Sequence, residues 1–342
     1  MTAPAPDRLP PSRLQGLAWA LVAVLVAAAY PAITRLGVTQ QAMTPLELAT
    51  LRYLVAGAVL LPVFIPRARR LDRQGWAEAA LLAFCQGTPL AALIAAGLAQ
   101  APAAHGAALT LGLMPAVTLL LGLLAGRRPG RNAALGAAMI AAGAALLAAA
   151  DAGEGGSALL GYAMFVLAAF MGGIYFVRLR DSGFTALEGA AFVAVLSGLG
   201  GLVALALTGG LPHLAEVAPR ALLAQAGFQG LLVGVLTMVA MNRAIALLGP
   251  TPATVCLSLV PAMAAAIAVP LLGEVPSPEA GTAIAAMVAG AALSAVSSTR
   301  SSSPPSGHGP GQRPLSRPVP RLAQVLRRMR PPLPRRRGMA AG

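Results

Sequence analysis

Three glutamines lie inside long apolar runs of this 342-residue chain: Gln86, Gln225 and Gln229. Gln225 and Gln229 are one helical turn apart and would share a face of a helix. A primary amide accepts a hydrogen bond from an ammonium group and donates one to a carboxylate, so these side chains suit a zwitterionic solute. The alternative is a hydrogen bond between helices, worth about 0.6 kcal/mol on average in one membrane protein. The residues alone favour neither reading.

Two prolines interrupt apolar runs of nearly the same shape. Pro115 lies in LGLMPAVTLLLGLLAG, 111–126, and Pro261 lies in LVPAMAAAIAVPLLGE, 259–274. Proline removes a backbone donor and pushes away the carbonyl four residues earlier, here at Leu111 and Leu257. Such a carbonyl is costly in lipid and should face protein, water or a ligand. The pair therefore predicts bent helices around a central cavity, with a simple packing kink as the alternative.

Four further side chains could contribute to a site. Tyr30 and Tyr175 could gate or stack on a solute, or belong to an aromatic belt at the interface. His105 could titrate in a coupled cycle, or be a hydrogen-bonded interface residue. Ser258, just before Pro261, could line the break in its helix or bond backward to its own helix.

Charged groups are rare inside the apolar runs. Arg52 lies about two turns into its run, with Glu47 nearby as a poorly aligned partner, and snorkelling to the interface is the alternative. No Asp or Glu is expected near the bilayer midplane, so a carboxylate proton relay and a site for multivalent cations both lack candidates. We expect neutral, zwitterionic or anionic small-molecule substrates, with no cofactor and no metal.

The elements that hold these residues are membrane helices. The chain is 57% hydrophobic and 11% charged, with a mean hydropathy of +0.74, whereas soluble domains are about 25% charged. Apolar runs of the length that crosses a bilayer recur along it. We predict an all-α membrane protein with ten transmembrane helices, at 16–34, 45–65, 76–98, 102–125, 132–150, 158–177, 185–207, 221–246, 251–272 and 279–296.

The chain repeats itself with a separation of about 145 residues. Tyr30 recurs as Tyr175, TPLE at 44–47 recurs as TALE at 185–188, Gln86-Gly87 recurs as Gln229-Gly230, and Pro115 recurs as Pro261. We predict one five-helix repeat at 16–150 and a second at 158–296. Because five is odd, the second repeat enters the membrane from the opposite side, and inverted repeats are a frequent plan of secondary transporters.

The arginines predict the orientation. All of the 25 basic residues are Arg, and those in short loops gather on one side, which should be cytoplasmic by the positive-inside rule. We therefore expect a cytoplasmic N-terminal segment, 1–15, and a cytoplasmic tail, 297–342. The tail is rich in Arg, Pro, Ser and Gly and should be disordered. It could contact anionic lipid, whereas nucleic-acid binding lacks interleaved aromatics and is not expected.

Several of these residues resemble a known family, the EamA-type transporters of the drug/metabolite transporter superfamily. The resemblance rests on YPAITR at 30–35, the TPLE opening of the second helix, the prolines of the fourth and ninth helices, and LLGE at 271–274. It implies a ten-helix fold in a bacterial inner membrane, a central cavity, and export of amino acids or other small metabolites. The chain departs from the family pattern at Ala27 and Ala28, and around Gly126 and Arg127.

The alternatives to a transporter are a membrane-embedded enzyme and a membrane-anchored scaffold. A membrane-embedded enzyme would need a nucleophile with its base, a metal cluster or a phosphate-binding loop, and no HExxH, GxSxG or GxxxxGK[ST] motif occurs. A membrane-anchored scaffold acting through its tail would leave the repeat unexplained. Small-residue faces such as GAAMIAAG, 136–143, allow close packing within the fold or between two copies in a homodimer. The sequence favours a secondary transporter, and an exporter among these.

Overall fold

The computed structural model describes residues 11–124, 126, 129–150 and 156–300, and over these ranges it contains helices and no strand. The predicted cytoplasmic tail and most of the N-terminal segment lie outside the described residues. The first half comprises α1 (Pro11–Thr39), α2 (Pro45–Ala68), α3 (Arg73–Gln86), α4 (Thr88–Gln100), α5 (Ala103–Ala107), the π-helical η1 (Ala108–Gly112), α6 (Met114–Leu124) and α7 (Arg131–Ala150). The second half comprises α8 (Gly156–Asp181), α9 (Ala186–Thr208), α10 (Gly210–Glu216), α11 (Pro219–Gln225), the π-helical η2 (Ala226–Leu236), α12 (Thr237–Leu248), α13 (Pro250–Leu257), α14 (Val260–Leu272) and α15 (Pro278–Arg300).

Nine helical spans among the described residues are long and apolar enough to cross a bilayer. Several of them join two or three elements, such as α3 with α4 over Arg73–Gln100 and α11 with η2 and α12 over Pro219–Leu248. The protein is therefore an all-α, multi-pass membrane protein. The exception is α15, which has 23 residues but is not among the nine, so the predicted count of ten remains a prediction.

Matching sequence signals start the second helix of each half. Thr44 and Glu47 form a capping box at the start of α2, in which each side chain bonds the other residue's backbone N–H. Thr185 and Glu188 form the same capping box at the start of α9. A capping box satisfies two backbone donors that a helix start leaves unpaired. The two boxes also fix the register of the repeat here at 141 residues.

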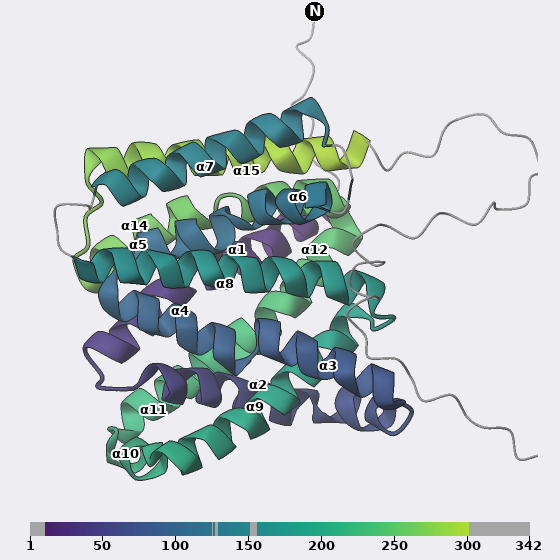
Figure 1. Ribbon diagram of the computed structural model, residues 1–342, viewed down its shortest axis with the longest axis vertical. Coiled ribbons are helices and arrows are strands. Elements are labelled where there is room, and N and C mark those ends of the chain that lie inside the picture. Colours follow the sequence, from purple (N-terminus) through teal and green to yellow (C-terminus); the bar gives the residue numbers. More distant parts are fainter. Residues whose placement is uncertain (1–10, 125, 127–128, 151–155, 301–342) are drawn as a thin grey trace, which may run out of the picture.

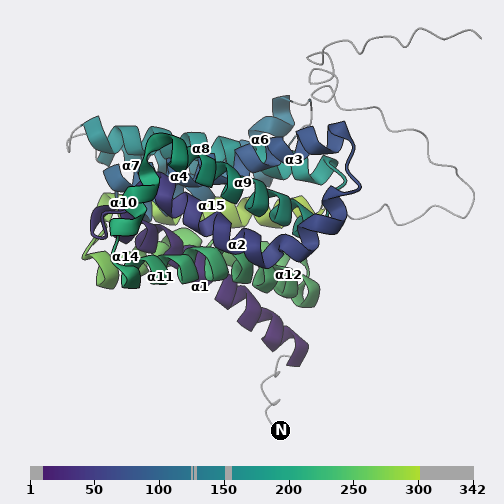
Figure 2. The same ribbon diagram turned by 90° about the horizontal axis from the view of Figure 1, so that it is seen from below.

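Equivalent helices of the two halves make equivalent packing contacts. α2 lies against α9, and α7 lies against α15, so in each pair a helix of the first half packs against its equivalent in the second half. α1 packs on α12 and α14 of the second half, while α8 packs on α4 and α6 of the first. Figure 1 shows α7 and α15 along one edge and α2 and α9 toward the opposite edge, with α1, α4, α8 and α14 between them, and Figure 2 views the molecule from the side of α2 and α9. This is the arrangement of a pseudo-twofold repeat.

Both repeated Gln-Gly pairs mark a close approach between helices. A Cβ on Gly87 would lie 1.7 Å from the Ser197 Oγ of α9, and a Cβ on Gly230 would lie 2.3 Å from the Val55 Cβ of α2. The helical span of α3 and α4 is broken at Gly87, and Gly230 lies within the π-helical η2. The glycines are therefore needed for space as the helices of one half cross those of the other.

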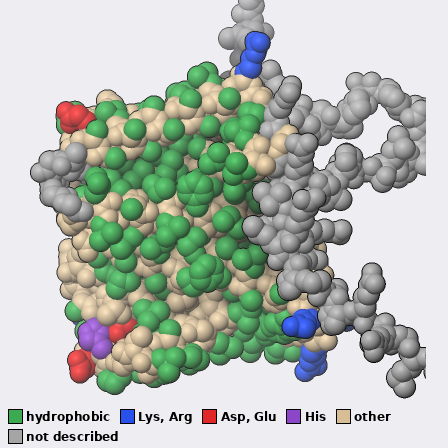
Figure 3. All heavy atoms as spheres, viewed as in Figure 1, with side chains coloured by type: hydrophobic (Ala, Val, Ile, Leu, Met, Phe, Trp, Pro, Cys, Tyr) green, Lys and Arg blue, Asp and Glu red, His purple; other side chains and the backbone are tan. Residues whose placement is uncertain are grey.

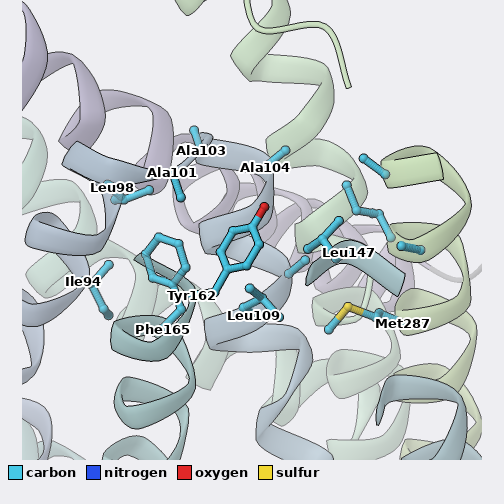
Figure 4. Close-up of a cluster of buried hydrophobic side chains, with 14 of the residues drawn as sticks. Ile94, Leu98, Ala101, Ala103, Ala104, Leu109, Leu147, Tyr162, Phe165 and Met287 are labelled. Carbon is cyan, nitrogen blue, oxygen red and sulfur yellow. The ribbon is translucent and has the colours of Figure 1, made fainter. Parts of the chain in front are cut away.

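The largest buried cluster joins both halves at one side of the bundle. Phe165 and Tyr162 of α8 lie among Leu98, Leu109 and Met287, and Figure 4 shows the two rings side by side with Leu98 and Ala101. Outside the core, large apolar side chains are exposed along most helices. Figure 3 shows this broad apolar surface between an edge with Arg side chains and an edge with acidic and His side chains. Such a surface suits lipid contact.

Candidate functional site

A narrow internal gap lies where α1, α2, α4 and η2 meet. Its lining combines four apolar with four polar or charged side chains: Leu48, Ala49, Ala91, Ala95, Tyr30, Thr34, Arg52 and Gln229. The gap is too narrow to admit a water molecule. Both halves of the chain contribute to it, because η2 belongs to the second repeat.

Arg52 brings a cation to this gap. Its guanidinium carbon lies 4.9 Å from the centre of the Tyr30 ring and 5.2 Å from the centre of the Tyr53 ring, within the range of cation–π attraction. Its Nε is buried without a hydrogen-bond partner. No described carboxylate lies within ion-pair distance of it; in particular, the suggested pairing with Glu47 is not formed.

A chain of hydrogen bonds joins the two neighbouring glutamines to α1. Gln229 Nε2 donates to Thr34 Oγ1 at 2.9 Å, and Thr34 Oγ1 donates to the Tyr30 carbonyl at 2.7 Å. Gln225 Nε2 donates to the Ile33 carbonyl at 3.0 Å and to Gln41 Oε1 at 2.9 Å. Both amides are almost fully buried. In this conformation their amide nitrogens make hydrogen bonds between segments of the fold, which is the alternative to binding a solute.

The third glutamine lies in a second polar group beyond Tyr53. The Tyr53 hydroxyl donates to the backbone carbonyl of Gln86, while the Gln86 Oε1 atom is buried without a partner. Tyr175 packs into the same buried cluster as Tyr53 and Cys85. Thus Tyr53 separates Arg52 and Tyr30 on one side from Gln86 and Tyr175 on the other, and only the Arg52 side borders the gap.

Other predicted site residues lie away from the gap. His105 Nδ1 lies 2.6 Å from the Tyr162 hydroxyl in the cluster between α5 and α8. Ser258 lies in the turn that follows α13, and its Oγ donates backward to the Val255 carbonyl of that helix at 2.7 Å. Neither residue lines the gap, so this structure does not bring them together with Tyr30 and Gln229.

The two prolines sit at helix breaks, but the carbonyl argument fails for the first. Pro115 follows the break between η1 and α6, and Pro261 follows the break between α13 and α14. The Leu111 carbonyl accepts the Leu113 N–H, so it is not free for a ligand as expected. A tight turn satisfies it locally. Neither proline lines the gap; Pro261 instead packs near Gly112, which joins the two breaks.

Ion pairs tie the helices at one end of the bundle, called here the Glu274 end. Glu274 pairs with Arg35 of α1 and accepts the Ala103 N–H at 2.9 Å, while Arg35 also donates to the Ala101 carbonyl at 2.6 Å. At the same end His213 Nδ1 lies 2.7 Å from Glu47 Oε1. This hydrogen bond, and secondarily the charge of Glu47, raises the pKa of the exposed His213 imidazole above its ordinary value.

The opposite end, called the Glu78 end, is tied by different pairs. Arg178 of α8 pairs with Glu78 of α3, and its Nε donates to Glu78 Oε1 at 2.9 Å. Arg67 Nε lies 3.2 Å from Glu188 Oε1. That contact is an ion pair without a hydrogen bond, because the geometry at the Arg67 Nε does not meet that of a hydrogen bond. Ion pairs therefore join helices at both ends of the bundle.

One polar residue of the gap, Thr34, and the partners of Arg52 were not predicted from the sequence. Arg52 stood out as a charge inside an apolar run, yet spacing suggested Glu47 as its partner rather than two tyrosines. Thr34 gave no signal, because a threonine commonly bonds back to its own helix. Elsewhere in the described ranges, no three of His, Cys, Asp and Glu come together as a metal site.

Comparisons with known proteins agree with this architecture. The model of the EamA-like transporter family matches residues 14–149 and 159–296. The "Probable terminal-alkyne amino-acid exporter" of Streptantibioticus cattleyicolor is 32% identical over 295 residues, covering 82% of this chain and 94% of that protein. A solved structure titled only "Crystal structure of protein" shares the fold, with a TM-score of 0.54 and 20% identity over 86% of this chain and 99% of its own. The chain belongs to the EamA-like transporter family.

Proposed function

We propose that the protein is a secondary transporter that exports amino acids or related small solutes across the bacterial inner membrane by alternating access. The observation that carries the proposal is the equivalent packing of helices in the two halves, together with a polar gap to which both halves contribute. Two similar halves of opposite direction can swap shapes, which exposes a shared site first to one side and then to the other.

The ion pairs at the two ends support this reading. Arg35 with Glu274 and Arg178 with Glu78 lie at opposite ends of the bundle, and each pair links helices of different halves. A transporter needs to close one end while it opens the other. Partly exposed ion pairs are suited to this, because breaking one costs only about 1 kcal/mol or less.

Amino acids are proposed as substrates on two grounds. The similar protein from Streptantibioticus cattleyicolor is named as an exporter of an amino acid, and the gap offers a cation beside hydroxyl and amide groups. The excess of Arg at the Glu78 end supports a cytoplasmic position of that end by the positive-inside rule, and with it N- and C-termini on the cytoplasmic side.

Counterflow in liposomes tests the proposal. Purified protein is reconstituted with one unlabelled solute inside, and entry of the same labelled solute is followed for amino acids, nucleosides, small peptides, organic anions and cationic drugs. A transient accumulation of labelled amino acid above equilibrium is expected. The matched control is Arg243→Gln, which removes an exposed Arg of α12 and should leave the rate unchanged. Absence of counterflow for every solute, with folded protein in the liposomes, contradicts the proposal.

A further inference from the structure

Arg52 is a charged group of the gap that the fold satisfies only in part: its side chain hydrogen-bonds the Tyr30 side chain of α1, yet its Nε has no partner. The amide nitrogens of Gln225 and Gln229 and the hydroxyl of Thr34 are engaged in hydrogen bonds between or within helices. The guanidinium of Arg52 has tyrosine rings over it but no described carboxylate beside it, and its Nε is buried without a partner. A residue that served only to hold helices together would be expected to pair with an acid or a carbonyl.

The position of Arg52 makes this arrangement costly. It lies seven residues into α2, which is about 10 Å along the helix from its start at Pro45. An ionised side chain so far inside a membrane protein is expensive unless a counter-charge or a polar cavity compensates it. Tyr30 and Tyr53 compensate part of the cost by cation–π attraction. The remaining unpaired donor is available to an anionic group that enters the gap.

The repeat shows that this cation belongs to one half alone. With the capping boxes in register, Arg52 of α2 corresponds to Val193 of α9, and Tyr53 corresponds to Ala194. The packing of α2 on α9 therefore does not require an arginine at this place, since the equivalent position is apolar and buried. The charge makes the interior asymmetric, with a cationic side toward Tyr30 and Gln229 and an uncharged side toward Gln86 and Tyr175.

We propose that Arg52 binds the carboxylate group of the transported solute, with the planar guanidinium held between the rings of Tyr30 and Tyr53. This inference rests on the proposed transport function and narrows its substrates to carboxylate-bearing solutes. Arginine is suited to the task because its donors match the two oxygens of a carboxylate and form short, charge-assisted hydrogen bonds. The walls of the gap separate as one end opens, which admits the solute.

Binding to the purified full-length protein tests the inference apart from transport. The probes are the proteinogenic amino acids and one terminal-alkyne amino acid, and the strongest ligand is then compared with its methyl ester and its decarboxylated amine. The wild type should bind the acid at least tenfold more tightly than the ester or the amine. Arg52→Gln should weaken binding of the acid roughly ten- to a hundredfold, the range expected for a hydrogen bond to a charged group, and should leave the ester little changed.

Two variants keep the result interpretable. Arg52→Lys retains the charge without the fork of donors, so it should bind the acid with intermediate affinity, and it serves in place of Arg52→Gln if that variant does not fold. Arg243→Gln should bind as the wild type does. Equal binding of acid and ester by the wild type, undiminished binding of the acid by Arg52→Gln, or no binding of any carboxylate overturns the inference. Counterflow of a solute that lacks a carboxylate would overturn it while the transport proposal stands.

Discussion

At the scale of single residues, the polar groups inside the helices divide by whether the fold itself satisfies them. Gln229 bonds Thr34, Ser258 bonds the helix that precedes it, and His105 lies in hydrogen-bond distance of Tyr162. Arg52 brings a charge to the gap whose buried Nε has no hydrogen-bond partner and which no described carboxylate pairs. Satisfied groups mainly hold helices in place, whereas a group with a free donor is ready for a ligand.

Gln229→Ala should separate these two roles. Loss of its bond to Thr34 should cost about 0.6 kcal/mol, the average for such bonds in one membrane protein, and so lower the thermal unfolding midpoint by a few degrees or less. Because the side chain also lines the gap, counterflow should fall at least severalfold. Gln225→Ala is the matched variant: it removes a buried amide that does not line the gap. Equal counterflow by wild type and Gln229→Ala contradicts a solute-facing role.

The contact of His213 with Glu47 predicts a pH dependence of stability. The pKa of His213 is raised in the folded protein, so the contact contributes fully below the unfolded pKa of about 6.5 and is lost as the pH rises through the raised value. The unfolding midpoint should therefore decline as the pH rises from about 6 to 8. Glu216 adds a further negative charge near His213. In His213→Gln this part of the decline should vanish, and an unchanged pH profile in that variant would refute the assignment.

Sequence reasoning found the polar residues more readily than their partners. Gln225 and Gln229 stand out because amides are rare in apolar runs, and Arg52 stands out for the same reason. The α1 partners of the two glutamines lie nearly 200 residues away in the chain. Only the packing of the second half on α1 brings them together. The suggested partner of Arg52, Glu47, is instead held by the start of its own helix and by His213.

At the scale of elements, the irregular helices recur at equivalent places in both halves. The helical span of α3 and α4 breaks at Gly87, and Gly230 lies in the π-helical η2. Breaks also precede Pro115 and Pro261. Proline in an apolar run predicted two of these irregularities. The other two depend on how closely a neighbouring helix approaches, which a single glycine in a Gly-rich membrane protein does not reveal.

Gly87→Ala should be strongly destabilising. Its new Cβ would fall 1.7 Å from Ser197 Oγ and 2.2 Å from the Ala83 carbonyl, so α4 and α9 must move apart. Overpacking of this kind typically costs about 1–3 kcal/mol, measurable as a lower unfolding midpoint. Gly200→Ala is the control, since nothing lies within 4 Å of the added methyl group. If both variants unfold at the same temperature, the close approach at Gly87 is not maintained in the protein.

Glu274→Gln should loosen the Glu274 end. The substitution weakens the pair with Arg35 that joins α1 to the end of α14, so that end should open more often. In a background without Cys85 and Cys256, a cysteine at buried Ala101 should react faster with a maleimide when Glu274→Gln is added. Glu279→Gln, a change of an exposed residue near the same end, should leave the rate as it was. An unchanged rate in Glu274→Gln contradicts a gating role for this pair.

At the scale of the whole molecule, two similar halves are built into one asymmetric transporter. The pairing of α2 with α9 and of α7 with α15 follows the repeat, whereas the ion pairs of the two ends do not. Glu274, which follows α14, has no acidic counterpart in the sequence directly after α6. Arg178 of α8 pairs with Glu78 of α3. The two ends are therefore joined by ion pairs from different parts of the repeat.

Distances across the two ends, measured on the same protein with and without a transported amino acid, test alternating access most directly. One spin-label pair would replace Thr39 and Ser277, beside Arg35 and Glu274, and the other would replace Arg73 and Asp181, beside Glu78 and Arg178. The account predicts reciprocal changes: a population with a longer distance at one end has a shorter distance at the other, and the amino acid shifts their proportions. Both ends widening together, or neither responding to any carried solute, would contradict alternating access around the gap at Arg52.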